Sequence, residues 1–182
     1  MTDFTITDDL FFSRTGLDHK RVQKLVEDGL KDADDGELFL EYRQSESVVL
    51  DDGRVKSAAF DTTQGFGLRA VAGETTGYAH ASELSEAAML RASEAVRAVS
   101  RGYGGEATPA PNLTNAELYA ETNPIGEVSF DSKLDLLADM DAYARGKDER
   151  VKQVTATLSG EWQAVQIIRA GGCRSTDIRP LV

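Results

Sequence analysis

The hydrophobic pattern of residues 17–30 predicts an amphipathic helix, because its apolar residues recur at helical spacing and its charged residues fall largely on the other side. The apolar face consists of Val22, Leu25, Val26 and Leu30. The preceding segment Thr15-Gly16-Leu17-Asp18 has the form of a capping box, with Asp in place of the more common Glu. Residues 1–16 are expected to form a loosely ordered leader, in which Leu10, Phe11 and Phe12 are the only apolar cluster.

Between residues 38 and 82 the pattern changes to short apolar or alternating runs, which are typical of β-strands. Asp52-Gly53 predicts a tight hairpin turn, because Asp-Gly suits positive φ. A second glycine-bearing turn is expected at Ala72-Gly73-Glu74, and the segment Gly65-Phe66-Gly67 is expected at the entrance of the strand before it. Consecutive strands with such short connections predict an antiparallel meander. The expected strands are 38–50, 55–60 and two strands within 61–82.

The second half of the chain repeats this combination of helix and strand. A helix with an alanine-rich apolar stripe is expected to begin at Ser82, and another is expected to begin at Ser129, since serine is a favoured N-cap. Strands are then expected at 151–158 and 161–170, followed by a last strand from Cys173. The turns between them are placed at Ser159-Gly160 and Gly171-Gly172.

Residues 102–124 contain three of the four prolines and lack periodicity, which is typical of a linker or a functional loop. The predicted fold class is therefore α+β, with antiparallel sheets flanked by helices in two lobes. The division is a leader at 1–16, an N-terminal lobe at 17–101, a linker at 102–124 and the start of a second lobe at 125–182. Because the last strand has no end signal, the chain is expected to be a fragment of a longer protein.

Composition narrows the class of protein. The net charge of −11, from 31 acidic and 20 basic residues, argues against direct nucleic-acid binding, which needs a basic face. The single cysteine, Cys173, excludes an intrachain disulfide. No signal peptide is recognisable, and no apolar run approaches the roughly 18 residues of a membrane span. These features predict a cytoplasmic protein with no membrane partner.

The sequence contains no clear motif for a metal site, a nucleotide site or a catalytic nucleophile. A catalytic zinc site needs about three protein ligands, but the two histidines, His19 and His80, are far apart and no HExxH or HExxxH pattern occurs. The segment 65–70 lacks the third glycine of a dinucleotide-binding motif. Cys173 as a reactive thiolate remains open, although a structural cysteine is the simpler interpretation.

Several motifs together resemble the N-terminal region of the TldD/PmbA family of zinc metalloproteases, once described as modulators of DNA gyrase, and are most similar to its TldD branch. The resemblance covers nearly the whole chain from residue 17. The motifs are Gln64-Gly65-x-Gly67-x-Arg69-Ala70, Gly73-Glu74-x-Thr76-Gly77-Tyr78-Ala79, Val154-Thr155-Ala156, Leu158-Ser159-Gly160 and Asp177-x-Arg179-Pro180-Leu181-Val182. The segment Gly171-Gly172-Cys173 departs from the family's usual polar turn.

The resemblance implies the N-terminal part of a peptidase more than twice this long, which hydrolyses unfolded proteins or peptides. Its zinc-binding HExxxH helix would follow Val182, so no catalytic or metal-binding residue is assigned to this chain. In the complete protein, zinc would polarise the scissile carbonyl and activate water, with a Glu as general base. The resemblance also implies pairing of TldD-type and PmbA-type subunits into a heterodimer or a homo-oligomer, with the N-terminal part enclosing the cleft and contributing to subunit contact.

Within this chain, the expected contribution is to shape the substrate cleft. Sheet edges are expected to hold an extended peptide by strand addition. The residues expected to shape the cleft are Gly65, Gly67, Arg69, Gly73 and Gly77. The first alternative is a truncated paralogue that binds a peptidase subunit and regulates it without catalysis. The reading frame downstream of Val182 would distinguish this paralogue from the N-terminal part of an enzyme. The second alternative is an independent hydrolase that uses Cys173.

The absence of a zinc-binding motif from the sequence leads to a direct prediction. The isolated 182-residue chain is expected to bind no stoichiometric zinc and to cleave no peptide, because the sequence contains no zinc-binding motif. Metal analysis of the purified chain checks the first point, and incubation with an unfolded protein checks the second. One tightly held zinc per chain would contradict the prediction.

Overall fold

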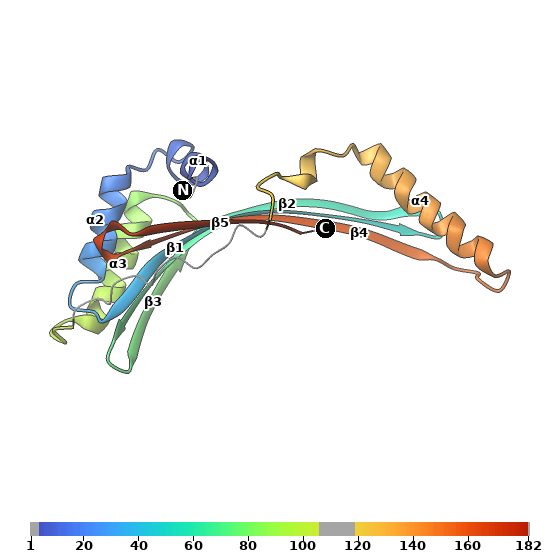
Figure 1. Ribbon diagram of the computed structural model, residues 1–182. Helices are drawn as coiled ribbons and strands as arrows, with labels where there is room; N and C mark the ends of the chain where they lie inside the picture. The colour runs from blue at the N-terminus through green and yellow to red at the C-terminus, as the bar shows by residue number, and fades with distance from the viewer. Residues whose placement is uncertain (1–3, 106–118, 182) are drawn as a thin grey trace. The chain divides into compact units, whose positions relative to one another are not determined.

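The structure is a computed structural model that describes residues 4–105 and 119–181. Its strands form one five-stranded antiparallel sheet in the order β3-β2-β1-β4-β5, and helices accompany the sheet, which confirms the predicted α+β class (Figure 1). The strands are β1 (Asp35–Asp51), β2 (Arg54–Ala72), β3 (Thr75–Ala81), β4 (Thr155–Arg169) and β5 (Arg174–Leu181). The helical elements are α1 (Thr5–Asp8), η1 (Asp9–Ser13), α2 (His19–Gly29), α3 (Glu86–Ser100), η2 (Pro124–Gly126), α4 (Phe130–Lys147) and η3 (Ala170–Gly172).

The described chain divides into two compact units. Unit 1 contains residues 4–42, 63–105 and 164–177, and unit 2 contains residues 43–62, 119–163 and 178–181. These units differ from the predicted lobes at 17–101 and 125–182, because four of the strands, β1, β2, β4 and β5, contribute residues to both units. The predicted linker at 102–124 falls largely on residues 106–118, which lie outside the described residues.

The strands are longer than the sequence pattern predicts. β1 runs without a break for 17 residues, and β2 joins the predicted strand 55–60 to the next one in a single strand of 19 residues. The predicted turn at Ser159-Gly160 is wrong, since β4 continues through it. Pairing with neighbouring strands outweighs the local turn preference of Ser-Gly. Gly65 and Gly67 therefore lie inside β2 and not at a strand entrance.

The turns that depend on positive φ are found where they were expected. Asp52 and Gly53 have φ of 54° and 73°, and they connect β1 to β2. Gly73, with φ of 59°, lies between β2 and β3. Gly171 and Gly172 both have φ of 78° and lie between β4 and β5. Each of these conformations requires residues that tolerate the left-handed region.

Two of the three predicted helix starts are displaced by three residues. Asp18 caps α2, with its carboxylate accepting a hydrogen bond from the Arg21 amide at 2.9 Å. The Thr15 hydroxyl does not cap this helix, because it donates to the Phe11 carbonyl of the preceding helical turn at 2.7 Å. Ser85 and not Ser82 caps α3, whereas Ser129 caps α4 as predicted.

The expectation of a loosely ordered leader at 1–16 is wrong for residues 4–16. Residues 5–13 are helical, and Leu10, Phe11 and Phe12 are only 4%, 0% and 3% exposed. Polar contacts add to this burial: Gln166 donates to the Asp8 carboxylate at 3.0 Å, and Arg174 forms an ion pair with the same carboxylate. Burial of three large apolar side chains supplies enough free energy to order a short segment.

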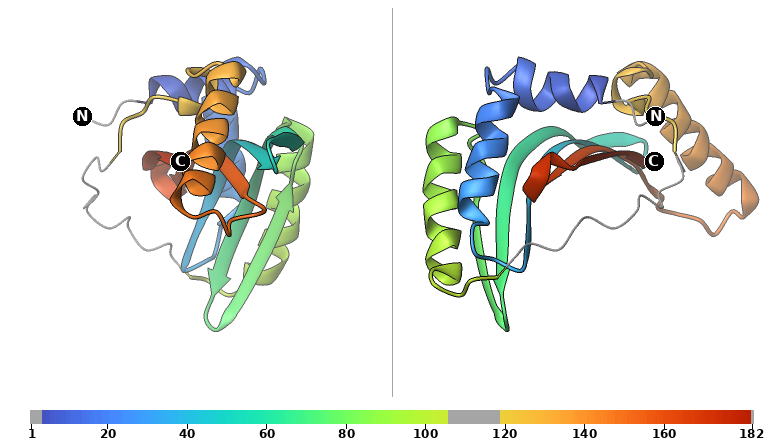
Figure 2. Two further views of the ribbon diagram at one scale, coloured as in Figure 1. Left: turned by 90° about the vertical axis from the view of Figure 1, so that its right-hand side faces the viewer. Right: turned by 60° about the vertical axis from the view of Figure 1, so that its left-hand side comes forward.

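In unit 1, α2 and α3 lie side by side on one face of the sheet (Figure 2). The Ser93 hydroxyl of α3 donates to the Leu25 carbonyl of α2 at 2.8 Å. Alternate residues of β2 face these helices and are buried, whereas the residues between them face away from the helices. The buried set is Phe66, Leu68, Ala70 and Ala72.

In unit 2, α4 packs on the strands through Leu137, which is fully buried against Val48, Leu50 and Ala156. The ammonium group of Lys133 is also buried, and it donates to the Glu46 carboxylate at 2.5 Å and to the Ile125 carbonyl at 2.9 Å. No helix among the described residues is long and apolar enough to cross a membrane.

The burial of Phe11 can be tested by truncation. Phe11→Ala is expected to lower the free energy of unfolding by about 3–5 kcal/mol, because it removes a fully buried ring and leaves a cavity. Phe60→Ala is the matched control, since Phe60 is 61% exposed, and it is expected to cost less than about 1 kcal/mol. Urea unfolding followed by circular dichroism measures both. Equal losses for the two variants would contradict an ordered N-terminal segment.

Candidate functional site

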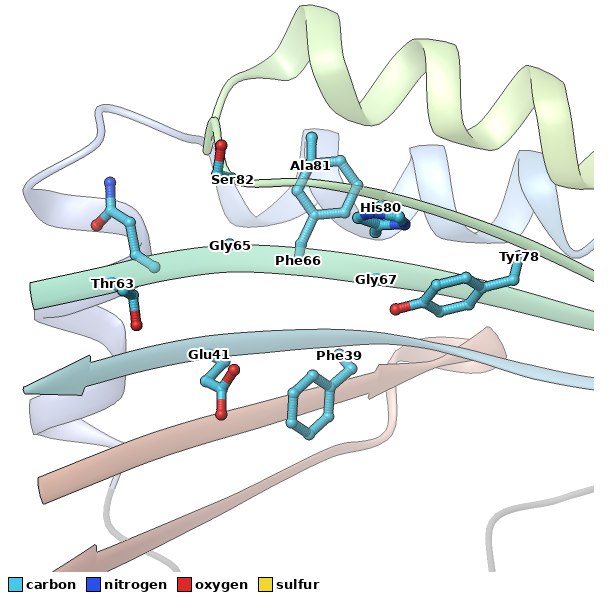
Figure 3. A pocket seen from close by; sticks show the side chains of 11 residues that line it. Phe39, Glu41, Thr63, Gly65, Phe66, Gly67, Tyr78, His80, Ala81 and Ser82 are labelled. Carbon is cyan, nitrogen blue, oxygen red and sulfur yellow. The ribbon is translucent and has the colours of Figure 1, made fainter. Parts of the chain in front are cut away.

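The candidate site is a pocket on the face of the unit 1 sheet that points away from α2 and α3 (Figure 3). We call it the β1–β3 pocket. It has a volume of about 280 Å³ and is lined by residues of all three strands and of the segment after β3. The lining residues are Phe39, Glu41, Thr63, Gln64, Gly65, Phe66, Gly67, Tyr78, His80, Ala81 and Ser82.

Two glycines form the floor of the pocket. Gly67 pairs with His80 and Arg69 pairs with Tyr78 across the antiparallel β2–β3 ladder. The Tyr78 ring crosses diagonally over Gly67, so a Cβ at position 67 would lie 2.5 Å from the Tyr78 hydroxyl oxygen. A Cβ at Gly65 would lie 2.7 Å from the Ala81 carbonyl oxygen. Only glycine permits these approaches, and an aromatic ring over a strand glycine covers its exposed backbone.

Aromatic rings form the sides of the pocket. The Tyr78 and His80 rings are stacked with their centroids 5.6 Å apart and an interplanar angle of 27°. Tyr78 is 64% exposed and Phe39 is 37% exposed, so ring surface of both residues remains accessible to a ligand. Figure 3 shows the Tyr78 hydroxyl group extending over Gly67, with Phe39 and Glu41 on neighbouring β1. The pocket therefore combines accessible π surfaces with one carboxylate.

Arg69 lies outside the β1–β3 pocket and is held by carboxylates of β1. Its guanidinium donates to the two Glu37 carboxylate oxygens at 2.7 and 2.9 Å and to Asp35 at 3.0 Å. The hydrogen bonds from Arg69 to Glu37 are the main cause that raises the pKa of Arg69 above its usual value. Arg169 of β4 forms an ion pair with the same Asp35. Arg69 thus links β2 to β1 through a cross-strand ion-pair network.

Gly73 and Gly77 also lie outside the pocket. Gly73 occupies the β2–β3 turn, where its amide donates to the Asp34 carboxylate at 2.7 Å. Gly77 faces α3, and a Cβ there would lie 2.8 Å from Val99 Cγ2. Of the five residues predicted to shape the cleft, Gly65 and Gly67 line the β1–β3 pocket, whereas Arg69, Gly73 and Gly77 do not.

Sequence reasoning missed the side chains that give the pocket its chemistry. Phe39 and Glu41 are two positions apart on β1, and Tyr78 and His80 are two positions apart on β3. The period of two along a strand places each pair on one face, so this signal was available. The predicted meander contains the pairing of β3 beside β2, but not the register that sets His80 opposite Gly67 and Tyr78 opposite Arg69 and so brings the two pairs to the same pocket.

The described residues do not provide a zinc site. No group of three His, Cys, Asp or Glu side chains suited to a metal ion occurs within residues 4–105 and 119–181. The His19 ring stacks on the Phe12 ring, with the two ring centroids 3.6 Å apart. The Nε2 atom of His19 lies 3.7 Å from the Asp8 carboxylate. Burial lowers the pKa of His19, and the Asp8 charge only partly opposes this effect. Cys173 is exposed. The ligands that a zinc ion needs are therefore not found in this part of the protein.

A second pocket, in unit 2, is largely apolar. We call it the α4 pocket. It has a volume of about 200 Å³ and lies beside the buried ion pair of Lys133 and Glu46. Its apolar lining consists of Pro124, Ile125, Val128, Leu136 and Leu158. Such a surface can bind an apolar side chain but offers few groups for chemistry.

The close contact of Tyr78 with Gly67 can be tested by a double-mutant cycle. Gly67→Ala is expected to destabilise the protein, because the new methyl group displaces the Tyr78 ring. In a Tyr78→Ala background, the same change is expected to be neutral or stabilising, which gives a coupling of about 1 kcal/mol or more. Urea unfolding of the four proteins measures it.

The matched control for this cycle is Gly160→Ala. Gly160 is also a strand glycine, but the atoms nearest to its added Cβ would be 3.7 Å away. This change is expected to be neutral or stabilising in either background. A coupling near zero between positions 67 and 78 would show that the ring does not require glycine beneath it.

Comparisons with known proteins agree with this architecture. Two family models match the chain: PmbA/TldA metallopeptidase domain 1 matches residues 36–100, and the PmbA/TldA metallopeptidase central domain matches residues 123–182. The metalloprotease TldD homolog of Haemophilus influenzae is 36% identical over 155 residues, which are 84% of this chain and 32% of that protein. The TldD homolog of Buchnera aphidicola (subspecies Schizaphis graminum) is 32% identical over 184 residues, which are 100% of this chain and 38% of that protein.

Two solved structures share the fold at low sequence identity. A protein of Bacteroides thetaiotaomicron described as a modulator of DNA gyrase matches with a TM-score of 0.65 and 16% identity, covering 88% of this chain and 38% of that chain. TldE from Thermococcus kodakarensis matches with a TM-score of 0.65 and 15% identity, covering 88% of this chain and 37% of that chain. The present chain therefore spans between about a third and two fifths of the length of these relatives. On the two family models and the TldD homologues together, the chain belongs to the PmbA/TldD metallopeptidase family.

Proposed function

We propose that this chain acts as the N-terminal, non-catalytic part of a TldD-like zinc metallopeptidase that degrades unfolded proteins or peptides. The observation that carries the proposal is the match of both domain 1 and the central domain of the family to a chain whose described residues hold no metal-ligand cluster. The chain's role is then to shape the substrate cleft and to contact a second subunit. A zinc ion, if bound by the complete enzyme, takes its ligands from elsewhere.

A contribution to the cleft is supported by an open edge of the sheet in unit 2. β3 pairs only with Phe66–Ala72 of β2, so among the described residues no strand pairs with residues 54–62 on that side. The side chains of residues 54–62 are all exposed. An unpaired strand edge offers backbone donors and acceptors to an extended peptide, which is the basis of strand addition.

A contribution to subunit contact is supported by the exposed face of α4. Leu136, Met140 and Tyr143 recur along one side of this helix and are 50%, 49% and 68% exposed. Asp135 and Asp139 lie next to them and are also exposed. The occupant we assign to this face is a TldD/PmbA-type partner subunit that presents apolar side chains bordered by basic residues. One of those apolar side chains would enter the α4 pocket, which Leu136 also lines.

The proposal can be tested with a chimera. The matching segment of the Haemophilus influenzae TldD homolog is replaced by this chain, and cleavage of an unfolded protein is measured together with bound zinc. The chimera is expected to retain zinc and to cleave the substrate within about tenfold of the parent protein, because the sequences are 36% identical over the matched region. A folded, zinc-loaded chimera without activity would contradict the proposed role.

The same chimera tests the subunit contact. Leu136→Glu combined with Met140→Glu is expected to weaken binding to the partner subunit, because it places charges in the apolar face of α4. Val55→Glu combined with Phe60→Glu is the matched control, since these residues are also exposed apolar residues of unit 2. Size-exclusion chromatography of each variant mixed with the partner subunit measures how much complex forms. Equal weakening by both pairs would remove α4 as the contact.

A further inference from the structure

We propose that the β1–β3 pocket binds the guanidinium group of an arginine side chain in a peptide. The pocket unites a carboxylate, accessible aromatic rings and a floor of two glycines, and neither the strand edge nor the α4 face proposed above uses this combination. As a substrate subsite, this assignment rests on the proposed peptidase function. As a binding site, it is a property of the 182-residue chain alone.

The charge of the pocket selects a cation. Glu41 is the single carboxylate in the lining, and the lining contains no lysine or arginine among the described residues. The whole chain carries a net charge of −11, so the surrounding field also favours cations. A carboxylate ligand would meet repulsion from the Glu41 carboxylate.

The aromatic sides favour a planar cation. A guanidinium stacks on aromatic faces and also donates hydrogen bonds in its plane, whereas an ammonium group is compact and more strongly hydrated. Contact of the Tyr78 ring with Gly67 keeps the ring low over the floor and leaves it 64% exposed. Phe39 and His80 present further ring surface from the adjacent strands. A guanidinium within this pocket meets rings and a carboxylate together.

Carboxylates of the same sheet already bind guanidinium groups of the chain itself. The carboxylates of Asp35 and Glu37 on β1 bind the guanidinium of Arg69, and Asp35 also binds Arg169. Asp35, Glu37 and Glu41 are spaced by even numbers along β1, so they belong to one face of the strand. Glu41 continues this row of carboxylates into the β1–β3 pocket.

The size of the pocket fits one side chain. Its volume of about 280 Å³ lies at or below the lower end of the roughly 300–1,000 Å³ that is common for small-molecule pockets. A single arginine side chain with its peptide backbone outside fits this volume better than a larger cofactor.

The experiment uses the isolated chain with two probes, N-acetyl-arginine amide and the isosteric N-acetyl-citrulline amide, at pH 8, where ordinary histidines are neutral. Binding is followed by the NMR chemical shifts of the Gly65 and Gly67 amides. The arginine probe is expected to bind about tenfold more tightly than the citrulline probe, because only the former carries the positive charge. N-acetyl-lysine amide is expected to bind more weakly than the arginine probe.

Two variants test the assigned contacts. Glu41→Gln is expected to reduce arginine affinity to the citrulline level, and Tyr78→Leu is expected to reduce it about threefold or more. Glu74→Gln and Tyr103→Leu are the matched controls, because Glu74 and Tyr103 are exposed and do not line the pocket, and they are expected to change nothing. Amide spectra of each variant verify that the sheet is intact.

The assignment is overturned by equal affinity for the arginine and citrulline probes, by arginine binding that Glu41→Gln leaves unchanged, or by a lysine probe that binds as tightly as arginine. None of these outcomes affects the peptidase proposal, because the titration involves no proteolysis. Conversely, an inactive chimera with an unchanged arginine preference would remove the peptidase role and leave the binding site standing.

Discussion

The continuous pairing of long strands is the constraint on which the rest of the structure depends. β1 and β2 extend for 17 and 19 residues, and both supply residues to each of the two units. On β1, Leu38 and Leu40 are buried in unit 1, whereas Val48 and Leu50 form the core of unit 2 with Leu137 of α4. A change that breaks either strand therefore affects the cores of both units.

The two faces of the unit 1 sheet follow from strand alternation and differ in what covers them. One face is covered by α2 and α3 and is apolar, with Leu68 and Ala70 among its buried residues. The other face is the one that α2 and α3 do not cover, and it carries the ion pairs of Arg69 and the β1–β3 pocket. The sheet requires glycine at two positions, and the reason differs between them. Gly77 admits α3 on the covered face, while Gly67 admits the Tyr78 ring on the open one.

The chain belongs to the PmbA/TldD metallopeptidase family, but this membership does not place a metal site among its described residues. No metal-ligand cluster is found in residues 4–105 and 119–181, and the histidines are in separate surroundings, one stacked on Phe12 and the other on Tyr78. What these residues offer is recognition surface: a strand edge in unit 2, an apolar helix face on α4 and an acidic, aromatic pocket in unit 1. Under the proposed function, these surfaces would position a substrate and a partner subunit.

The sequence by itself determined the α+β class, the family and the positions of three of the four predicted turns. Asp52-Gly53, Gly73 and Gly171-Gly172 were predictable because positive φ depends on the residue at that position. The N-cap of α4 at Ser129 was predictable for the same local reason. The tertiary structure decided the rest. Ser159-Gly160 continues a strand because neighbouring strands pair with it, and Phe11 is ordered because residues far away in sequence bury it. The β1–β3 pocket likewise exists because β3 places Tyr78 and His80 beside Gly67, a proximity that residue types alone do not encode.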